Sequence, residues 1–218
     1  MVLIKDITSL KPDKIRAVIR SGKWDKPTTG IALGYAQANL VILPKKYALD
    51  FFLFCQRNPK PCPLLEVLEP GDFRPDFLAC EADVRTDAAR YDVYVKGNLK
   101  ASPTSVKELW RKDFVTFFLG CSFSFEEAII RSGIPVRHIE EGKNVPMYLT
   151  SIKCRPAGIF HGPMVVTMRP VNPAEVVKVV QITSRYAFVH GGPVHIGDPE
   201  IIGIKNLEKP DFGDPVTI

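Results

Sequence analysis

Residues 114–130 constrain the fold of this chain more than any other stretch. Residues 114–119 form an apolar run rich in β-favouring side chains, which is the pattern of a strand buried on both faces. A helix start follows, because Ser124 and Glu127 have the three-residue spacing of a capping box and precede an apolar helix face. The sequence therefore predicts a buried strand that passes directly into a helix.

The turn between this strand and this helix is the first candidate site. Gly120, Cys121 and Ser122 would form a tight turn whose free backbone N–H groups point toward a ligand. Helix N-termini on open α/β sheets favour anions, through unpaired N–H donors and the helix dipole. The turn thus indicates a carboxylate or phosphate site, although a buried strand with a well-capped helix and no ligand fits the same residues.

Strands and helices are expected to alternate along the rest of the chain. Helices are predicted over residues 9–22, 46–57 and 173–185, the second of them buried on most sides. Strands are predicted over residues 133–140 and 164–168. This alternation favours an α/β fold with a mostly parallel or mixed sheet covered by helices.

A smaller unit is expected inside this α/β fold. Short β-like runs at residues 64–68 and 91–95 are separated by turn-rich and charged residues, which is typical of a small α+β insertion. The prediction is a main domain over residues 1–62 and 107–218 and an insertion over residues 63–106.

Charge and cysteine usage narrow the possible environments and partners. The net charge of +5 is spread along the chain without an interleaved aromatic and basic motif, which argues against a nucleic-acid partner. The five cysteines are an odd number without a CxxC pair, which favours reduced thiols in the cytoplasm. The first residues lack a signal-peptide core and no apolar run reaches 18 residues, so no membrane association is expected.

Two histidines and a carboxylate share one glycine-rich loop. His190 and His195 flank a Gly-Gly-Pro turn close to Asp198. Such a group can transfer protons near neutral pH or hold a divalent metal, and it can equally make structural hydrogen bonds alone. His190 and His195 are therefore candidate acid–base residues, and all three are candidate metal ligands.

Other side chains are candidates for binding a small anion. Arginines near the ends of predicted elements can hold carboxylates through two hydrogen bonds, although each could equally be a surface arginine. These arginines are Arg137, Arg169 and Arg185. The polar residues that could face the same site, or could hydrogen-bond a loop, are Tyr35, Gln37 and Asn39.

The turn itself offers further chemistry. Cys121 at a helix N-terminus could be a nucleophile, but a pocket wall fits as well because no His or Asp is near in sequence. Ser122 and Ser124 are expected to donate hydrogen bonds or cap the helix, and Glu126 is a candidate base. The chain has no GxGxxG, P-loop, GxSxG or HExxH motif, which argues against nucleotide cofactors, serine hydrolases and zincins.

Eight short motifs resemble those of one family, in order along nearly the whole chain from about residue 14. They are GYAQANL at 34–40, FCQRNP at 54–59, GCSFSFE at 120–126, RHI at 137–139, NVPMY at 144–148, GPMVV at 162–166, MRP at 168–170 and VHGGPVHIGDP at 189–199. Together they are similar to the D-glutamate cyclase family, whose many bacterial members are labelled hydro-lyases.

The resemblance implies a two-part α/β architecture and the cyclising dehydration of D-glutamate to 5-oxo-D-proline with a divalent cation, Mn²⁺. On this basis Arg169 or Arg185 would clamp the α-carboxylate, the turn at Cys121 and Ser122 or a metal would polarise the γ-carboxylate, and His190 or His195 would move protons. The family pattern continues beyond Ile218, so the chain is expected to end before a further segment.

Two other functions fit the same residues. One is a hydro-lyase acting on another small carboxylic acid, and the other is a non-catalytic protein that binds an acidic metabolite. All three functions share a small carboxylate or amino acid as the ligand. A homodimer is the default expectation for the assembly.

Overall fold

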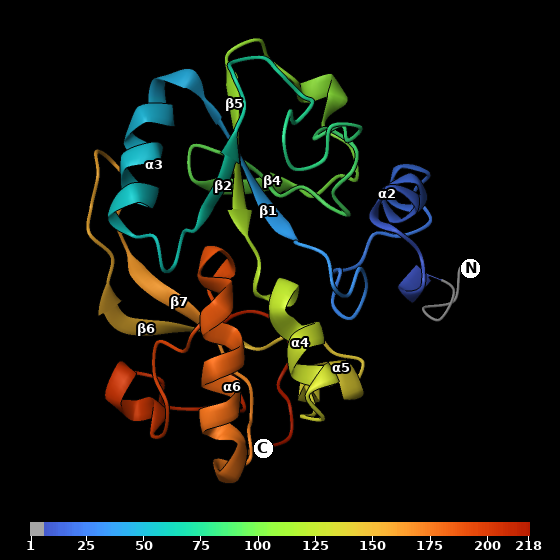
Figure 1. Cartoon of the computed structure of the whole chain (residues 1–218). Coiled ribbons are helices and arrows are strands. Elements are labelled where there is room, and N and C mark those ends of the chain that lie inside the picture. The colour runs from blue at the N-terminus through green and yellow to red at the C-terminus, as the bar shows by residue number, and fades with distance from the viewer. Residues whose placement is uncertain (1–6) are drawn as a thin grey trace.

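The predicted central strand is β5, Phe114–Gly120, in the middle of a three-stranded sheet (Figure 1). The computed structural model describes residues 7–218, so the first six residues, expected to lack a signal-peptide core, lie outside it. β1, Ala38–Pro44, and β2, Leu64–Val67, flank β5. The β1 register pairs Ala38 with Gly120, which places the start of β1 beside the turn that follows β5.

The sheets are antiparallel, so the expectation of a mostly parallel sheet was wrong. Both β1 and β2 run antiparallel to β5. The apolar run in β5 arises because both faces of the strand are covered, as Phe117 packs with Phe51 and Cys55 while Phe118 packs with Leu68 and Val84. An apolar run of this kind therefore indicates a strand buried on both faces but does not indicate its direction. The α/β class at the general level is confirmed.

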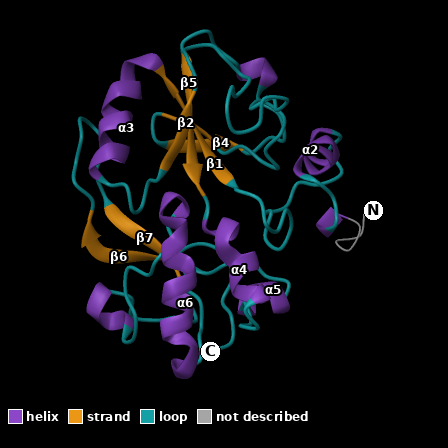
Figure 2. Cartoon of the chain, in the orientation of Figure 1, coloured by secondary structure: helices purple, strands orange, loops and turns teal. Residues whose placement is uncertain are grey.

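Two smaller sheets complete the strands of residues 7–218 (Figure 2). β3, Val93–Val95, pairs with β4, Asn98–Ala101, across a turn with positive φ at Lys96 and Gly97. β6, Met147–Lys153, pairs with β7, Pro163–Thr167. The predicted insertion spans β2, which pairs with β5 in the central sheet, and the division into domains stays a prediction.

The first helices match the predicted positions closely. α2 is Pro12–Arg20, with Ile15 and Ile19 buried against Trp24 and Ile31. α3 is Lys45–Arg57, which lies beside the central sheet in Figure 1. The prediction that α3 is buried on most sides was wrong, because Leu49 is 70% exposed and Phe52 and Leu53 also face outward.

The helices after β5 carry the side chains that matter for the site. A 3₁₀ turn, Ser122–Phe125, leads into α4, Glu126–Arg131, and the one-turn helix α5, Arg137–Glu140, follows. The strand predicted at residues 133–140 was therefore wrong, because residues 134–136 form no regular element and residues 137–140 form α5. Ile134 and Val136 are buried, and Ile139 on α5 packs against them.

The last helical segment is interrupted. A 3₁₀ turn, Pro173–Glu175, precedes α6, Val176–Thr183. Asn172 caps the 3₁₀ turn, because its side chain accepts from the Ala174 N–H at 3.0 Å. The 3₁₀ segment Ser184–Val189 then leads to His190, and a further 3₁₀ turn covers Pro199–Ile202. One more 3₁₀ turn, Lys107–Leu109, precedes β5. Among the described residues, 7–218, none of the helices has the length and apolar character needed to cross a membrane.

Candidate active site

Two hydrogen bonds tie the turn after β5 to Gln37, the residue before β1, and a third closes the turn on itself. The Cys121 N–H donates to the Gln37 carbonyl at 2.9 Å, and the Gln37 N–H donates to Ser124 Oγ at 2.8 Å. Ser124 Oγ in turn donates to the Cys121 carbonyl at 2.8 Å. The turn is thus rigid, because Ser124 closes it back onto β1.

The predicted capping box was wrong for this reason. Ser124 Oγ is engaged at the turn, and Glu127 pairs with Arg131 at 2.6 Å. α4 begins at Glu126, and no side chain of residues 7–218 caps its N-terminus. The carboxylates of Glu126 and Glu127 lie in its first turn, where they offset the helix dipole. An anion held by this helix end alone, as the sequence suggested, would compete with these two carboxylates.

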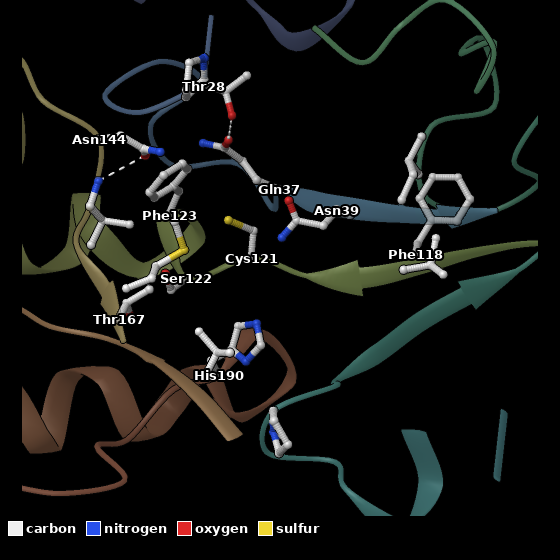
Figure 3. A pocket seen from close by; sticks show the side chains of 18 of the residues that line it. Thr28, Gln37, Asn39, Phe118, Cys121, Ser122, Phe123, Asn144, Thr167 and His190 are labelled. Carbon is white, nitrogen blue, oxygen red and sulfur yellow. Dashed lines mark hydrogen bonds between the residues drawn. The ribbon is translucent and has the colours of Figure 1, made fainter. Parts of the chain in front are cut away.

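An open groove with a volume of about 2470 Å³ runs along β1 and past the turn after β5. Its lining includes Asn39, Cys121, Ser122, Arg169 and His190. Figure 3 shows the side chains of Asn39, Cys121 and His190 around one opening, contributed by β1, the turn after β5 and the loop after the 3₁₀ segment Ser184–Val189. The structure thus brings these predicted site residues together.

The predicted polar run of Tyr35, Gln37 and Asn39 divides into different environments. Gln37 accepts from Thr28 Oγ1 at 2.7 Å and donates to the Ile31 carbonyl at 2.9 Å, so its amide holds the preceding loop. Tyr35 is exposed at the surface of the same groove. Asn39 is exposed and approaches the Cys121 thiol. Asn39 is therefore the member of the run best placed to contact a ligand beside Cys121.

A buried ion cluster lies directly behind the turn. Glu126 is fully buried, and its Oε1 is 2.5 Å from Arg169 Nη2, 3.1 Å from Arg169 Nε and 3.0 Å from His138 Nε2. The His138 ring is within ion-pair distance but is not aimed for a hydrogen bond, and Glu126 Oε2 has no hydrogen-bond partner among residues 7–218. Burial alone would raise the pKa of Glu126, but Arg169 and His138 together lower it.

Arg169 is held in place by this cluster. Nη2 also donates to Ser122 Oγ at 3.1 Å, Nη1 donates to Thr167 Oγ1 at 2.9 Å, and the guanidinium lies over the Phe125 ring at 5.1 Å. With the bonds from Nε and Nη2 to Glu126, Arg169 makes four hydrogen bonds. A guanidinium has five N–H donors, so one Nη1 proton is left. Arg169 is thus no free bidentate clamp, and it can offer one N–H beside the Ser122 hydroxyl at the groove wall.

The other predicted arginines lie away from the groove. Arg137 pairs with Glu140 at 3.2 Å on α5, and Arg185 is exposed on the 3₁₀ segment Ser184–Val189. Neither lines the groove formed by the described residues. The geometry therefore favours Arg169 over Arg185 as the arginine closest to a ligand.

His190 has a defined tautomer. Its Nδ1 is 2.9 Å from the Lys60 carbonyl, which can only accept, so Nδ1 carries the proton and Nε2 the lone pair. Burial lowers the pKa of His190, with smaller contributions from the charges of Lys60 and Arg169, whereas the carbonyls of Lys60 and Gly120 act in the opposite direction. His190 is therefore a neutral imidazole at neutral pH, as a general base requires.

The arrangement does not fit a divalent metal. His195 Nε2 is 2.7 Å from the Asp198 carbonyl, and Asp198 Oδ1 accepts from the Glu200 N–H at 3.0 Å. Within residues 7–218, no group of three or more His, Cys, Asp or Glu side chains could hold a metal ion. His190, His195 and Asp198 thus do not form the metal site that the sequence left open.

Cys121 is a poor nucleophile in this environment. Burial raises the pKa of its thiol, and the negative charge of Glu126 adds to the effect, so the thiolate is depleted at neutral pH. We expect iodoacetamide at pH 7.5 to label exposed Cys80 well before Cys121, as read by mass spectrometry of tryptic peptides. Labelling of Cys121 ahead of Cys80 would contradict this environment and would favour covalent catalysis.

Sequence reasoning missed several residues of the site. Thr167 orients Arg169, Lys60 holds the loop of His190, and Asn144 accepts from Thr29 Oγ1 at 2.9 Å. The short motif at residues 144–148 was the available signal for Asn144, and Thr167 lies between the motifs at residues 162–166 and 168–170. Lys60 had no local signal, because its partner lies 130 residues away.

Comparison with known proteins identifies the family of this chain. Residues 115–218, which contain the turn, Arg169 and His190, match the family model described as D-glutamate cyclase. A "putative hydro-lyase" of Thermoanaerobacter sp. (strain X514) is 60% identical over 210 residues, covering 96% of this chain and 79% of the relative. One from Geobacillus kaustophilus is 59% identical, covering 93% of this chain and 77% of the relative.

A third relative, named in the same way, comes from Bacillus licheniformis and is 57% identical over 97% of this chain and 81% of its own length. At the general level these relatives define a protein of the lyase class. The chain belongs to the D-glutamate cyclase family.

Proposed function

We propose that the protein is a hydro-lyase that cyclises D-glutamate to 5-oxo-D-proline in the groove beside Cys121. The observation that carries the proposal is a neutral, tautomer-fixed His190 on the same groove as Ser122 and the remaining N–H of Arg169. Cyclisation needs a base for the amine and donors for a carboxylate, and this groove holds both. The family match at residues 115–218 supports the choice of D-glutamate over other small acids.

The reaction conserves atoms without an added reactant. Two protons leave the substrate ammonium, its nitrogen bonds to the γ-carboxyl carbon, and one γ-carboxylate oxygen departs with both protons as water. His190 Nε2 would take the first proton and return it to the departing oxygen. A single general acid–base group of this kind contributes about 10²–10⁴-fold to the rate.

Ser122 and Arg169 would stabilise the charge that develops on the γ-carboxyl group. Ser122 Oγ accepts from Arg169, which leaves the hydroxyl proton of Ser122 to donate to a ligand. Together with the remaining Arg169 N–H, it gives two donors fixed before the substrate binds. Donors held in advance stabilise a developing oxyanion more strongly than mobile ones. Glu126 would support this geometry by holding Arg169, and it would not act as the base because its buried carboxylate is paired with that arginine.

The proposed setting is the cytoplasm. All five cysteines are free thiols, which suits a reducing compartment. A small carboxylate is the proposed ligand, and a homodimer remains the expected assembly.

Proton NMR of the purified protein incubated with D-glutamate tests the proposal. We expect 5-oxo-D-proline to accumulate, with L-glutamate converted more slowly, and the assay should be run with and without added Mn²⁺. A series of small hydroxy acids serves as the comparison. Loss of water from one of these acids instead of D-glutamate would overturn the substrate, and binding without any product would overturn the activity.

A further inference from the structure

Lys60 lies in the turn between α3 and β2, beside the loop that carries His190. This turn is fixed by its neighbours, because the Cys62 N–H donates to the Asn58 carbonyl at 3.0 Å. The Asn58 side chain is itself buried, donating to the Arg155 carbonyl at 2.8 Å and accepting from the Arg155 N–H at 2.7 Å. The backbone of Lys60 therefore has a rigid base.

The ammonium of Lys60 donates hydrogen bonds to three consecutive carbonyls of the loop. Nζ donates to the His190 carbonyl at 3.0 Å, to the Gly191 carbonyl at 2.5 Å and to the Gly192 carbonyl. An ammonium has three N–H donors, so this loop uses all of them. The carbonyl of Lys60 also accepts from His190 Nδ1, which makes four hydrogen bonds between one residue and one short loop.

The loop needs such support because its backbone is unusual. His190 has a φ of 70°, in the left-handed region that costs a non-glycine residue roughly 1–2 kcal/mol. At Gly191 a Cβ atom would lie 2.1 Å from the Thr183 carbonyl oxygen, so the loop is packed tightly against the end of α6. Three convergent carbonyls would repel one another without a cation between them. The ammonium of Lys60 supplies that cation.

We infer that Lys60 is a positioning residue, which fixes the tautomer and the direction of the His190 ring without contacting the substrate. The inference rests on the proposed role of His190 as the base. The Lys60 carbonyl selects the Nδ1–H tautomer, and the Lys60 ammonium holds the backbone from which the ring projects. Lys60 and Arg169 are the charged groups that act on His190, and both disfavour its protonation.

The first test needs no substitution. Two-bond ¹H–¹⁵N spectra of the full chain are expected to show His190 protonated at Nδ1 at pH 7.5.

The same spectra of Lys60→Met are expected to show the His190 pKa moving up toward its ordinary value, because the cation is lost and the loop opens. Lys178→Met is the matched control, since Lys178 donates to the Ser132 carbonyl at 2.6 Å at an exposed position.

Activity gives a second readout. In Lys60→Met we expect kcat with D-glutamate to fall by about 10- to 100-fold, because small displacements of a catalytic group have effects of this size. An Nε2-protonated His190 in the unmodified protein, or an unchanged His190 pKa in Lys60→Met, would overturn the inference. If the unmodified protein does not cyclise D-glutamate, the proposed function fails while the tautomer and pKa still decide the role of Lys60.

Discussion

Replacing Arg169 with methionine is expected to lower the free energy of unfolding by about 3–5 kcal/mol, because it leaves the buried Glu126 carboxylate without its cation. For a chain of this size, 1 kcal/mol shifts the melting temperature by roughly 2–4 °C. Thermal unfolding followed by circular dichroism should therefore show Tm lowered by about 6–20 °C.

Two further variants separate the charge from the packing of Arg169. Arg131→Met removes a cation from an exposed pair with Glu127, for which a loss of under about 1 kcal/mol is expected. Adding Glu126→Gln to Arg169→Met removes both buried charges and should recover part of the stability. A Tm for Arg169→Met as high as that of Arg131→Met would show that the buried pair contributes little.

The same pair predicts a dependence of stability on pH. The pKa of Glu126 is lowered in the folded protein, so its contribution is present above the unfolded value of about 4.3 and is lost as the pH falls through the folded pKa. This acid-sensitive part of the stability should be absent from Glu126→Gln.

Replacing His190 with asparagine is expected to lower kcat for D-glutamate by about 10²–10⁴-fold, because the general base is lost. His161→Asn is the matched control, since His161 is exposed and lies outside the groove residues of the described chain. Discontinuous assays of 5-oxo-D-proline at saturating D-glutamate measure both variants. Equal rates for His190→Asn and the unmodified protein would remove His190 from the mechanism.

The pH profile provides an independent check on His190. Because the pKa of His190 is lowered, the neutral base persists below the usual range of a histidine, near pH 6.5. We expect kcat/KM to hold its plateau on acidification past that value and to fall only at lower pH. A fall beginning well above pH 6.5 would indicate a different base.

The central strand and most helices could be predicted because their signals are local. The apolar run of β5 and the periodicity of α2 and α3 each lie within one element. Strand direction could not be predicted, because burial on both faces gives the same apolar run in parallel and antiparallel sheets. The capping box at Ser124 also could not be judged from sequence, since its hydroxyl bonds Gln37 and Cys121 at the turn and does not cap the helix that follows.

The site was predicted residue by residue but not in its pairings. The turn at Cys121, Arg169 and His190 were all candidates, yet Arg169 pairs with Glu126 across 43 residues and Lys60 contacts His190 across 130. Such pairs depend on how β7 and the loop after α6 pack against the turn, which no local pattern encodes. Arg137 and Arg185 were candidates because they lie near the ends of predicted elements, and neither lines the groove of the described residues. The metal candidates were chosen because they share one loop, and the described residues hold no group of three ligands.

The position of D-glutamate in a crystal structure of the His190→Asn variant tests the central claim most directly. We expect the amine nitrogen of the ligand within hydrogen-bond distance of the side chain at position 190. We also expect the γ-carboxylate at Ser122 Oγ and Arg169 Nη1. D-Glutamate bound away from the turn at Cys121, with these donors facing solvent, would contradict it.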